Sequence, residues 1–163
     1  MGYTGHISQQ QRTPEIKAEE AFRVIQTAFE MIGIIEEVRK HSDNPDLKDL
    51  NMRIGVHTGK IVAGIIGTKL VRYDIFGGDV LIANKMESNG IAGQVVVSED
   101  TKRLLMIDPL FSESLDFRKH RTVELQGIKR TVEAFIVAPR EETIGDNSSI
   151  SGGGHFAEHL EEE

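Results

Sequence analysis

The feature that most constrains this chain is a long amphipathic pattern followed by several short segments of β-type composition. Between Glu15 and Lys40 the apolar residues recur at the spacing of one helix face, and Glu, Lys and Arg fill the other face. Pro14 suits the first turn of this helix and Thr13 suits its N-cap. The apolar positions are Ala18, Ala21, Phe22, Ile25, Ala28, Phe29, Ile32, Ile35 and Val38.

Short β-rich runs follow this helix. After a loop at Ser42–Asp49, the runs Met52–His57 and Ile61–Ile66 are expected to form a hairpin through Thr58–Gly59–Lys60. Tyr73–Phe76 is expected to be a short strand or a turn. The early part of the chain therefore alternates between a helix and short strands.

The central part repeats this alternation. We expect a helix at Asp79–Ser88, ended by Asn89–Gly90, and then a buried strand at Val95–Ser98. Ser98 is a suitable N-cap for a short helix at Glu99–Met106.

Strands cluster in the last third of the body. The expected strands are Leu115–Lys119, Thr122–Leu125 and Val132–Val137, with a turn at Gly127–Arg130. The whole pattern indicates an α+β domain with helices on one or both faces of a sheet.

Composition narrows the class of protein. The net charge of −7 is concentrated in 139–163, where one Arg and seven acidic residues give −6, so the body carries about −1. This balance is unlike that of a basic nucleic-acid binder. The chain has no cysteine for disulfides or thiolate metal sites, and no apolar run approaches the roughly 18 residues that span a membrane. We expect a domain over 1–138 and an acidic, disordered tail over 139–163.

The glycine-rich stretch "MRIGVHTGKIVAGIIG" does not fit a known phosphate loop. Gly59 and Gly64 have the Walker spacing, but Ile65–Ile66 stand where Lys and Ser or Thr belong. The glycines are therefore interpreted as positions of turns and close approach. Arg53, taken alone, is compatible with an ordinary surface residue. His57 is interpreted as part of a turn, without a carboxylate arranged beside it in sequence, and the other histidines form no metal motif.

The ordered set of motifs is more specific than any single one. "MRIGVHTG", "VAGIIG", "RYDIF", "NKMES" and "GQVVVS" occur in sequence, and "VELQGIKRTVEAFIV" follows them. Together they resemble the class III nucleotidyl cyclases, the adenylyl and guanylyl cyclase catalytic domains, from about Met1 to Ala138. The resemblance implies a ferredoxin-like α+β domain with a mixed or antiparallel sheet and flanking helices.

The resemblance also implies a chemistry and a partner. Family members form their nucleotide site between two cyclase domains, and the ribose 3′-hydroxyl attacks the α-phosphate of ATP or GTP while pyrophosphate leaves. Two metal ions, Mg or Mn, and cationic side chains offset the growing charge. The expected partner is a second cyclase domain in a homo- or heterodimer, and the expected location is the cytoplasm or the cytoplasmic side of a larger membrane protein.

The resemblance assigns roles to particular residues. Arg53 falls on the phosphate-binding arginine, whose guanidinium suits phosphate oxygens. Asp74 falls on the purine-reading carboxylate, as in ATP-type cyclases. Leu81 and Lys85 fall on the asparagine and arginine that stabilise the transition state. Leu81 cannot donate a hydrogen bond. Lys85 keeps the positive charge of the arginine but lacks the planar guanidinium, which can bind phosphate through two N–H groups at once. Gln126 falls near a position that can carry a phosphate-binding lysine.

The same comparison leaves the metal site outside this chain. Asp79–Asn84, "DVLIAN", resembles the metal-supplying half of two-part cyclases. Yet both metal aspartates of the family precede a segment like "MGYTG", so no metal ligands are expected here. We therefore expect a domain that lacks its first strand and helices, and a chain that is inactive alone. The alternative is a catalytically inactive, cyclase-like scaffold or regulatory dimerisation domain.

Overall fold

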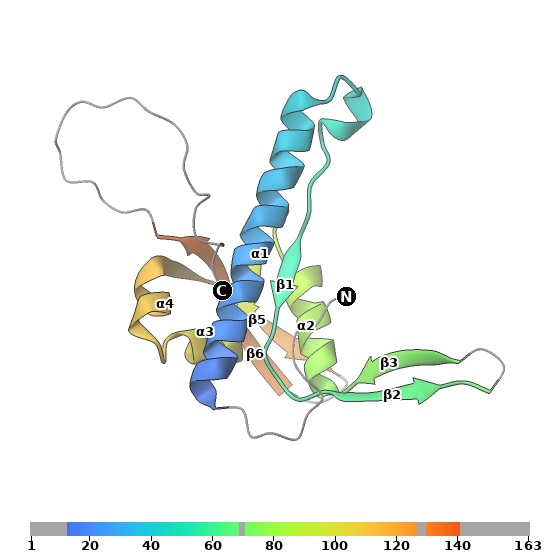
Figure 1. Cartoon of the computed structure of the whole chain (residues 1–163), viewed down its shortest axis with the longest axis vertical. Helices are drawn as coiled ribbons and strands as arrows, with labels where there is room; N and C mark the ends of the chain where they lie inside the picture. Colours follow the sequence, from blue (N-terminus) through green and yellow to red (C-terminus); the bar gives the residue numbers. More distant parts are fainter. Residues whose placement is uncertain (1–12, 69–70, 127–129, 141–163) are drawn as a thin grey trace, which may run out of the picture.

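The computed structural model describes residues 13–68, 71–126 and 130–140, and Figure 1 shows how their elements are arranged. The helices are α1 (Pro14–His41), the 3₁₀ helix η1 (Pro45–Leu47), α2 (Gly78–Ser88), α3 (Glu99–Leu105) and α4 (Pro109–Ser114). The strands are β1 (Ile54–Val56), β2 (Val62–Ile66), β3 (Arg72–Phe76), β4 (Val95–Ser98), β5 (Leu115–Leu125) and β6 (Arg130–Pro139).

A mixed sheet forms the body. Its strand order is β1-β4-β6-β5, with β1 parallel to β4 and the other neighbours antiparallel. β2 and β3 form a separate two-stranded antiparallel sheet that projects from the body as an arm (Figure 1). The predicted α+β class, with a mixed sheet and flanking helices, is confirmed.

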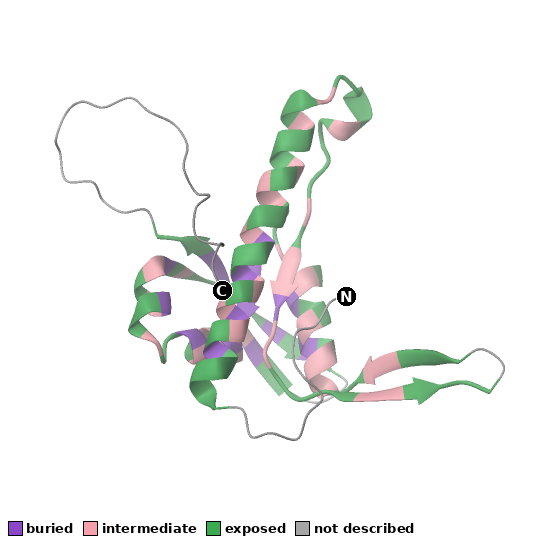
Figure 2. Cartoon of the chain, in the orientation of Figure 1, coloured by how far each residue is buried: buried purple, intermediate pink, exposed green. Residues whose placement is uncertain are grey.

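The predicted first helix is confirmed, with its cap. The Thr13 side chain accepts a hydrogen bond from the Ile16 amide, and Pro14 occupies the first turn. The buried residues of α1 lie between Ala18 and Ala28, and the remainder of the helix toward its C-terminal end extends beyond the sheet with exposed side chains such as Ile34 (Figure 2). Packing against the sheet therefore stabilises only part of the apolar stripe.

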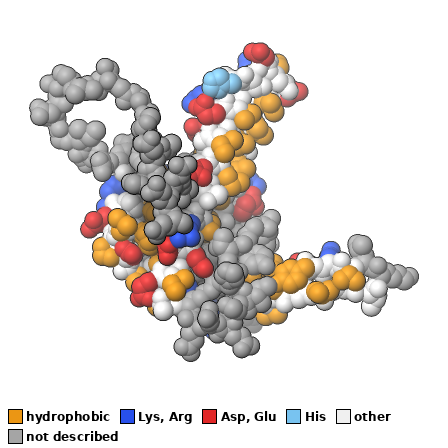
Figure 3. Space-filling view, viewed as in Figure 1, with side chains coloured by type: hydrophobic (Ala, Val, Ile, Leu, Met, Phe, Trp, Pro, Cys, Tyr) orange, Lys and Arg blue, Asp and Glu red, His pale blue; other side chains and the backbone are white. Residues whose placement is uncertain are grey.

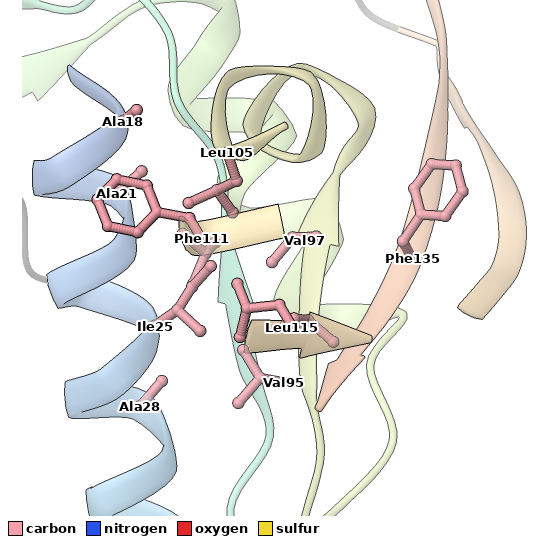
Figure 4. Close-up of a cluster of buried hydrophobic side chains, with 12 residues drawn as sticks. Ala18, Ala21, Ile25, Ala28, Val95, Val97, Leu105, Phe111, Leu115 and Phe135 are labelled. Carbon is pink, nitrogen blue, oxygen red and sulfur yellow. The ribbon is translucent and has the colours of Figure 1, made fainter. Parts of the chain in front are cut away.

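β4 is buried on both faces, and its alternating side chains join two cores. Val95 and Val97 face the cluster under α1 (Figure 4). At its edge, Phe22 of α1 stacks on Phe111 with ring centroids 4.4 Å apart. Val96 faces a second cluster, which α2 covers. The first cluster comprises Ala18, Ala21, Ile25, Ala28, Val56, Val95, Val97, Leu105, Phe111, Leu115, Phe135 and Val137.

The predicted hairpin between Met52–His57 and Ile61–Ile66 is wrong. β1 pairs in parallel with β4, from Ile54 opposite Val95 to Val56 opposite Val97, whereas β2 pairs with β3. The local pattern indicated two strands correctly. Their partners were not visible locally because a parallel pair needs a long crossover, which here includes the arm and α2.

The late strands differ from expectation in one respect. The two strands predicted at Leu115–Lys119 and Thr122–Leu125 are one strand, β5, with a register shift between Lys119 and Arg121. A bulge of this kind interrupts the pattern without ending the strand. The short helix α4 was not predicted, although the Asp108 side chain caps it by accepting from the Leu110 amide at 2.9 Å.

Two expectations fall largely outside the described residues. These are the turn predicted at Gly127–Arg130 and the acidic tail predicted over 139–163. The division into a domain and a tail thus remains a prediction. In the described ranges, no helix is both long and apolar enough to cross a membrane.

Candidate functional site

Arg53 lies immediately before β1 and is exposed, whereas the next residue, Ile54, packs against the core. Its guanidinium pairs with Glu87 of α2: Nε and Nη2 lie 3.1 and 3.0 Å from Oε1. The two side chains are 49% and 46% exposed. An exposed ion pair of this kind contributes about 0–1 kcal/mol. A phosphate could therefore take the place of the Glu87 carboxylate at little cost.

Asp74 lies in the arm, on β3 opposite Gly64 of β2. Its Oδ1 accepts a hydrogen bond from the Ile75 amide at 2.9 Å, and its Oδ2 lies 3.6 Å from Nη2 of Arg72. The side chain is partly exposed. One carboxylate face thus remains open to solvent, just ahead of α2.

Leu81 and Lys85 project from the exposed side of α2, as their four-residue spacing predicts. Ile82 and Met86 lie on the buried side and are fully covered. The helix therefore has a packing face and a solvent face, and the two positions that correspond to transition-state residues are on the solvent face. Gln126, the last described residue before a gap, is also exposed.

α2 separates the two residues assigned to nucleotide binding. Arg53 contacts Glu87 near the C-terminal end of the helix, whereas Asp74 comes four residues before its N-terminal end. A helix of these 11 residues is about 16 Å long. The structure does not bring Arg53 and Asp74 together within one chain.

Gly55 explains how α2 approaches β1 so closely. A Cβ at Gly55 would overlap the backbone of Met86 and Glu87. The interpretation of this glycine as a position of close approach is confirmed, although the neighbour is α2 and not a hairpin strand. The contact holds Arg53 and Glu87 side by side.

The interpretation of His57 as turn chemistry without a carboxylate is wrong. The imidazole is 2% exposed, its Nε2 lies 3.4 Å from Oδ1 of Asp79, and its Nδ1 lies 2.7 Å from Oγ of Ser98. These partners come 22 and 41 positions later in the chain. Sequence spacing could not pair them, although the first-turn position of Asp79 and the cap position of Ser98 were both visible.

The surroundings of His57 favour its neutral form. Burial lowers the pKa of His57 below its ordinary value, and the positive charge of Arg130 acts in the same direction. The hydrogen bond and charge of Asp79 and the charge of Asp100 oppose this effect without cancelling it.

A Ser–His–Asp set normally suggests nucleophilic catalysis, but this one does not have the required access. Ser98 is fully buried, and its Oγ accepts from the Thr101 amide at 3.3 Å to cap α3. A substrate cannot reach that oxygen, so the set is structural.

The described residues do not fit a metal centre. Within 13–68, 71–126 and 130–140 no group of three or more His, Asp and Glu side chains could hold an ion. No chemical step is assigned to a metal here.

Comparison with known proteins identifies the family. The profile described as "Adenylate and Guanylate cyclase catalytic domain" matches residues 7–139. The chain belongs to this family, whose members form cyclic nucleotides.

Curated relatives include both kinds of cyclase. Guanylate cyclase alpha of Plasmodium falciparum (isolate 3D7) is 42% identical over 127 residues, covering 78% of this chain and 3% of the relative. Adenylate cyclase type 9 of Gallus gallus is 38% identical over 92 residues, covering 56% and 7%. The chain thus spans only a small part of the length of these relatives.

Solved structures share the fold. The adenylyl cyclase CyaB from P. aeruginosa matches with a TM-score of 0.64 and 20% identity, over 86% of this chain and 67% of that one. The guanylyl cyclase Cya2 matches with a TM-score of 0.63 and 26% identity, over 85% and 66%. The predicted class III cyclase fold is confirmed.

Proposed function

We propose that this chain is part of a nucleotidyl cyclase domain that forms cyclic AMP or cyclic GMP at an interface between two domains, in intracellular signalling. The observation that carries the proposal is the position of Arg53 and Asp74 at opposite ends of α2. One chain cannot offer both to one nucleotide, whereas two facing domains can each supply one of them.

Arg53 has the role of a phosphate ligand in this proposal. Its guanidinium exchanges the Glu87 carboxylate for phosphate oxygens, which accept the same pair of N–H donors. In the transition state the α-phosphate gains charge as the 3′-oxygen attacks and pyrophosphate departs. A fixed cation beside that charge lowers the barrier.

Asp74 has the role of a purine acceptor. Its carboxylate accepts N–H groups, and it lies on β3 of the arm. The arm projects from the body (Figure 1), where a neighbouring domain could meet it. The relatives include guanylate and adenylate cyclases, so both ATP and GTP belong in the test.

The arm has the composition of a contact surface. Figure 3 shows hydrophobic side chains along its visible face, and on the arm and its flanks Val62, Ile65, Val71 and Tyr73 are 69%, 72%, 64% and 50% exposed. Apolar side chains gathered on a projecting hairpin mark a protein interface. The proposed partner is a second cyclase domain, of the same or a related chain, on the cytoplasmic side of any membrane.

A second candidate is an inactive scaffold that keeps only dimerisation. Leu81 and Lys85, in place of the asparagine and arginine of the family, favour it. The two candidates differ in whether the dimer forms cyclic nucleotide, and both require the interface between two domains.

The test compares two preparations supplied with Mg or Mn and with ATP or GTP. The isolated chain is expected to make no cyclic nucleotide. The chain reconstituted with the upstream segment of its domain and a complementary domain is expected to do so. Cyclic nucleotide formation by the isolated chain would overturn the proposal that the nucleotide site is shared between two domains. A reconstituted dimer without turnover would support the scaffold.

A further inference from the structure

The Asp79 carboxylate, in the first turn of α2, links the N-terminal end of this helix to the loop that follows β1. Oδ2 of Asp79 accepts a hydrogen bond from the Lys60 amide at 2.6 Å, and Oδ1 lies 3.4 Å from Nε2 of His57. A Cβ at Gly59 would overlap this carboxylate, so the loop and the helix start are in direct contact. Asp79 therefore determines where α2 begins relative to β1.

His57 extends this attachment to the start of α3. Ser98, which lies 2.7 Å from Nδ1, caps α3, and Oγ1 of Thr101 donates to Oγ1 of Thr58 at 3.1 Å. Because β1 and β4 are parallel neighbours, their carboxyl ends meet at one edge of the sheet. The imidazole thus lies where two strands end and two helices begin.

Counting protons indicates which tautomer of His57 fits. If Ser98 donates to Nδ1, then Nε2 carries the proton and faces the Asp79 carboxylate. If Nδ1 carries the only proton, a lone pair on Nε2 faces that carboxylate, which is repulsive. At 3.4 Å the Nε2 atom does not meet hydrogen-bond geometry, so the contact is a long one.

Charged groups from three elements face this imidazole. They are Asp79 of α2, Asp100 of α3 and Arg130 at the start of β6. Arg130 lies 3.7 Å from Oδ1 of Asp79 and 2.9 Å from Oδ2 of Asp100, so it offsets part of their charge. A second proton would add to Nδ1, and the resulting positive charge of the imidazolium would attract the Asp79 carboxylate.

We propose that His57 is a positioning residue that, through Asp79, sets the N-terminal end of α2 and thereby the orientation of the arm segment bearing Asp74 relative to Arg53. The other end of α2 is held independently, where Gly55 contacts the helix backbone. Loss of His57 therefore releases the Asp74 end and leaves the Arg53 end in place. The consequence for nucleotide selection rests on the proposed function, whereas the consequence for α2 does not.

The first test uses the 163-residue chain and needs no activity. In His57→Ala, hydrogen exchange at the Lys60 amide is expected to quicken roughly tenfold, because Asp79, its acceptor, loses the imidazole contact that helps to hold it in place. His57→Gln, which keeps a donor and an acceptor, is expected to restore most of the protection. His41→Gln, at a side chain 77% exposed, is the matched control and should change nothing. Unchanged protection in His57→Ala would overturn the proposal.

A spectroscopic measurement on the unmodified chain covers the case in which His57→Ala does not fold. Imidazole nitrogen shifts are expected to report protonation at Nε2 in the neutral form. A neutral His57 protonated at Nδ1 would overturn the proposal without any variant.

The second test uses the reconstituted two-domain assembly. In an assembly of two copies of the reconstituted domain, in which one copy's Asp74 faces the other copy's Arg53, His57→Ala is expected to weaken binding of ATP or GTP roughly tenfold, while binding of inorganic tripolyphosphate stays the same, because only the purine end moves. If binding of the nucleotide and binding of tripolyphosphate weakened equally, the proposal that loss of His57 affects only the Asp74 end would be overturned. If neither ligand binds to the unmodified assembly, the proposed function fails, while the exchange result still decides the role of His57.

Discussion

The ion pair between Arg53 and Glu87 places the proposed phosphate ligand at an exposed position with a replaceable partner. Leu81 and Lys85 lie on the solvent face of α2 and would not reach the same phosphate. These positions allow the residue assignments to be ranked.

In the reconstituted assembly, Arg53→Ala is expected to reduce turnover on the order of 10²-fold, the loss typical of a charged contact to a developing phosphate charge. Leu81→Ala and Lys85→Ala are expected to cost little. Initial rates of cyclic nucleotide formation measure all three. The reverse order, with Lys85 essential, would show that the chain is the transition-state half.

His57 also makes a prediction about pH. Because burial lowers its pKa in the folded state, the unfolded chain binds the proton more readily. The resulting stability is complete above the ordinary value of 6.5 and declines as pH falls from there toward the lower folded pKa. Urea unfolding of the native chain and of His57→Gln across this range should show a smaller loss in the variant. Parallel curves would contradict the prediction.

At the scale of elements, α2 separates the two residues that we propose bind nucleotide, Arg53 and Asp74. Its buried side joins a cluster with β4, β5 and β6, and its solvent side carries Leu81 and Lys85. The contacts that the structure describes for α2 are therefore those of a helix packed against the sheet.

Substitutions on the two faces of α2 should differ in their effect on the free energy of unfolding. Ile82→Ala and Met86→Ala remove fully buried side chains and are expected to lower the free energy of unfolding by about 2–5 kcal/mol. Leu81→Ala, at a side chain 46% exposed, is expected to change it by at most about 0.5 kcal/mol. Urea midpoints provide the measurement, and similar losses at all three positions would contradict the two-faced helix.

At the scale of the molecule, the body is small and the arm projects from it (Figure 1). An apolar hairpin exposed to water favours association. We expect the free chain to self-associate through the arm at micromolar concentration.

Ile65→Lys on the arm is expected to shift the chain toward monomer in analytical ultracentrifugation, because a charge in an apolar contact is costly. Leu110→Lys on α4, at a side chain 70% exposed, is the matched control and should leave association unchanged. A compact monomer for the unmodified chain, or equal effects of both variants, would refute a role for the arm.

The sequence alone determined the elements whose signals are local. The apolar period and the caps at Thr13 and Ser98 predicted α1, β4 and α3, because those signals arise within a few residues. The ordered motifs identified the family, whereas the roles that they assign to Arg53 and Asp74 stay predictions.

Only the tertiary structure decided which strands pair and which side chains meet. β1 joins β4, Arg53 meets Glu87 34 positions away, and His57 meets Asp79 and Ser98. These contacts depend on how α2 and the arm are inserted between two parallel strands, which no local pattern encodes. The physical reason is that burial and charge act between residues that are close in space, whatever their separation along the chain.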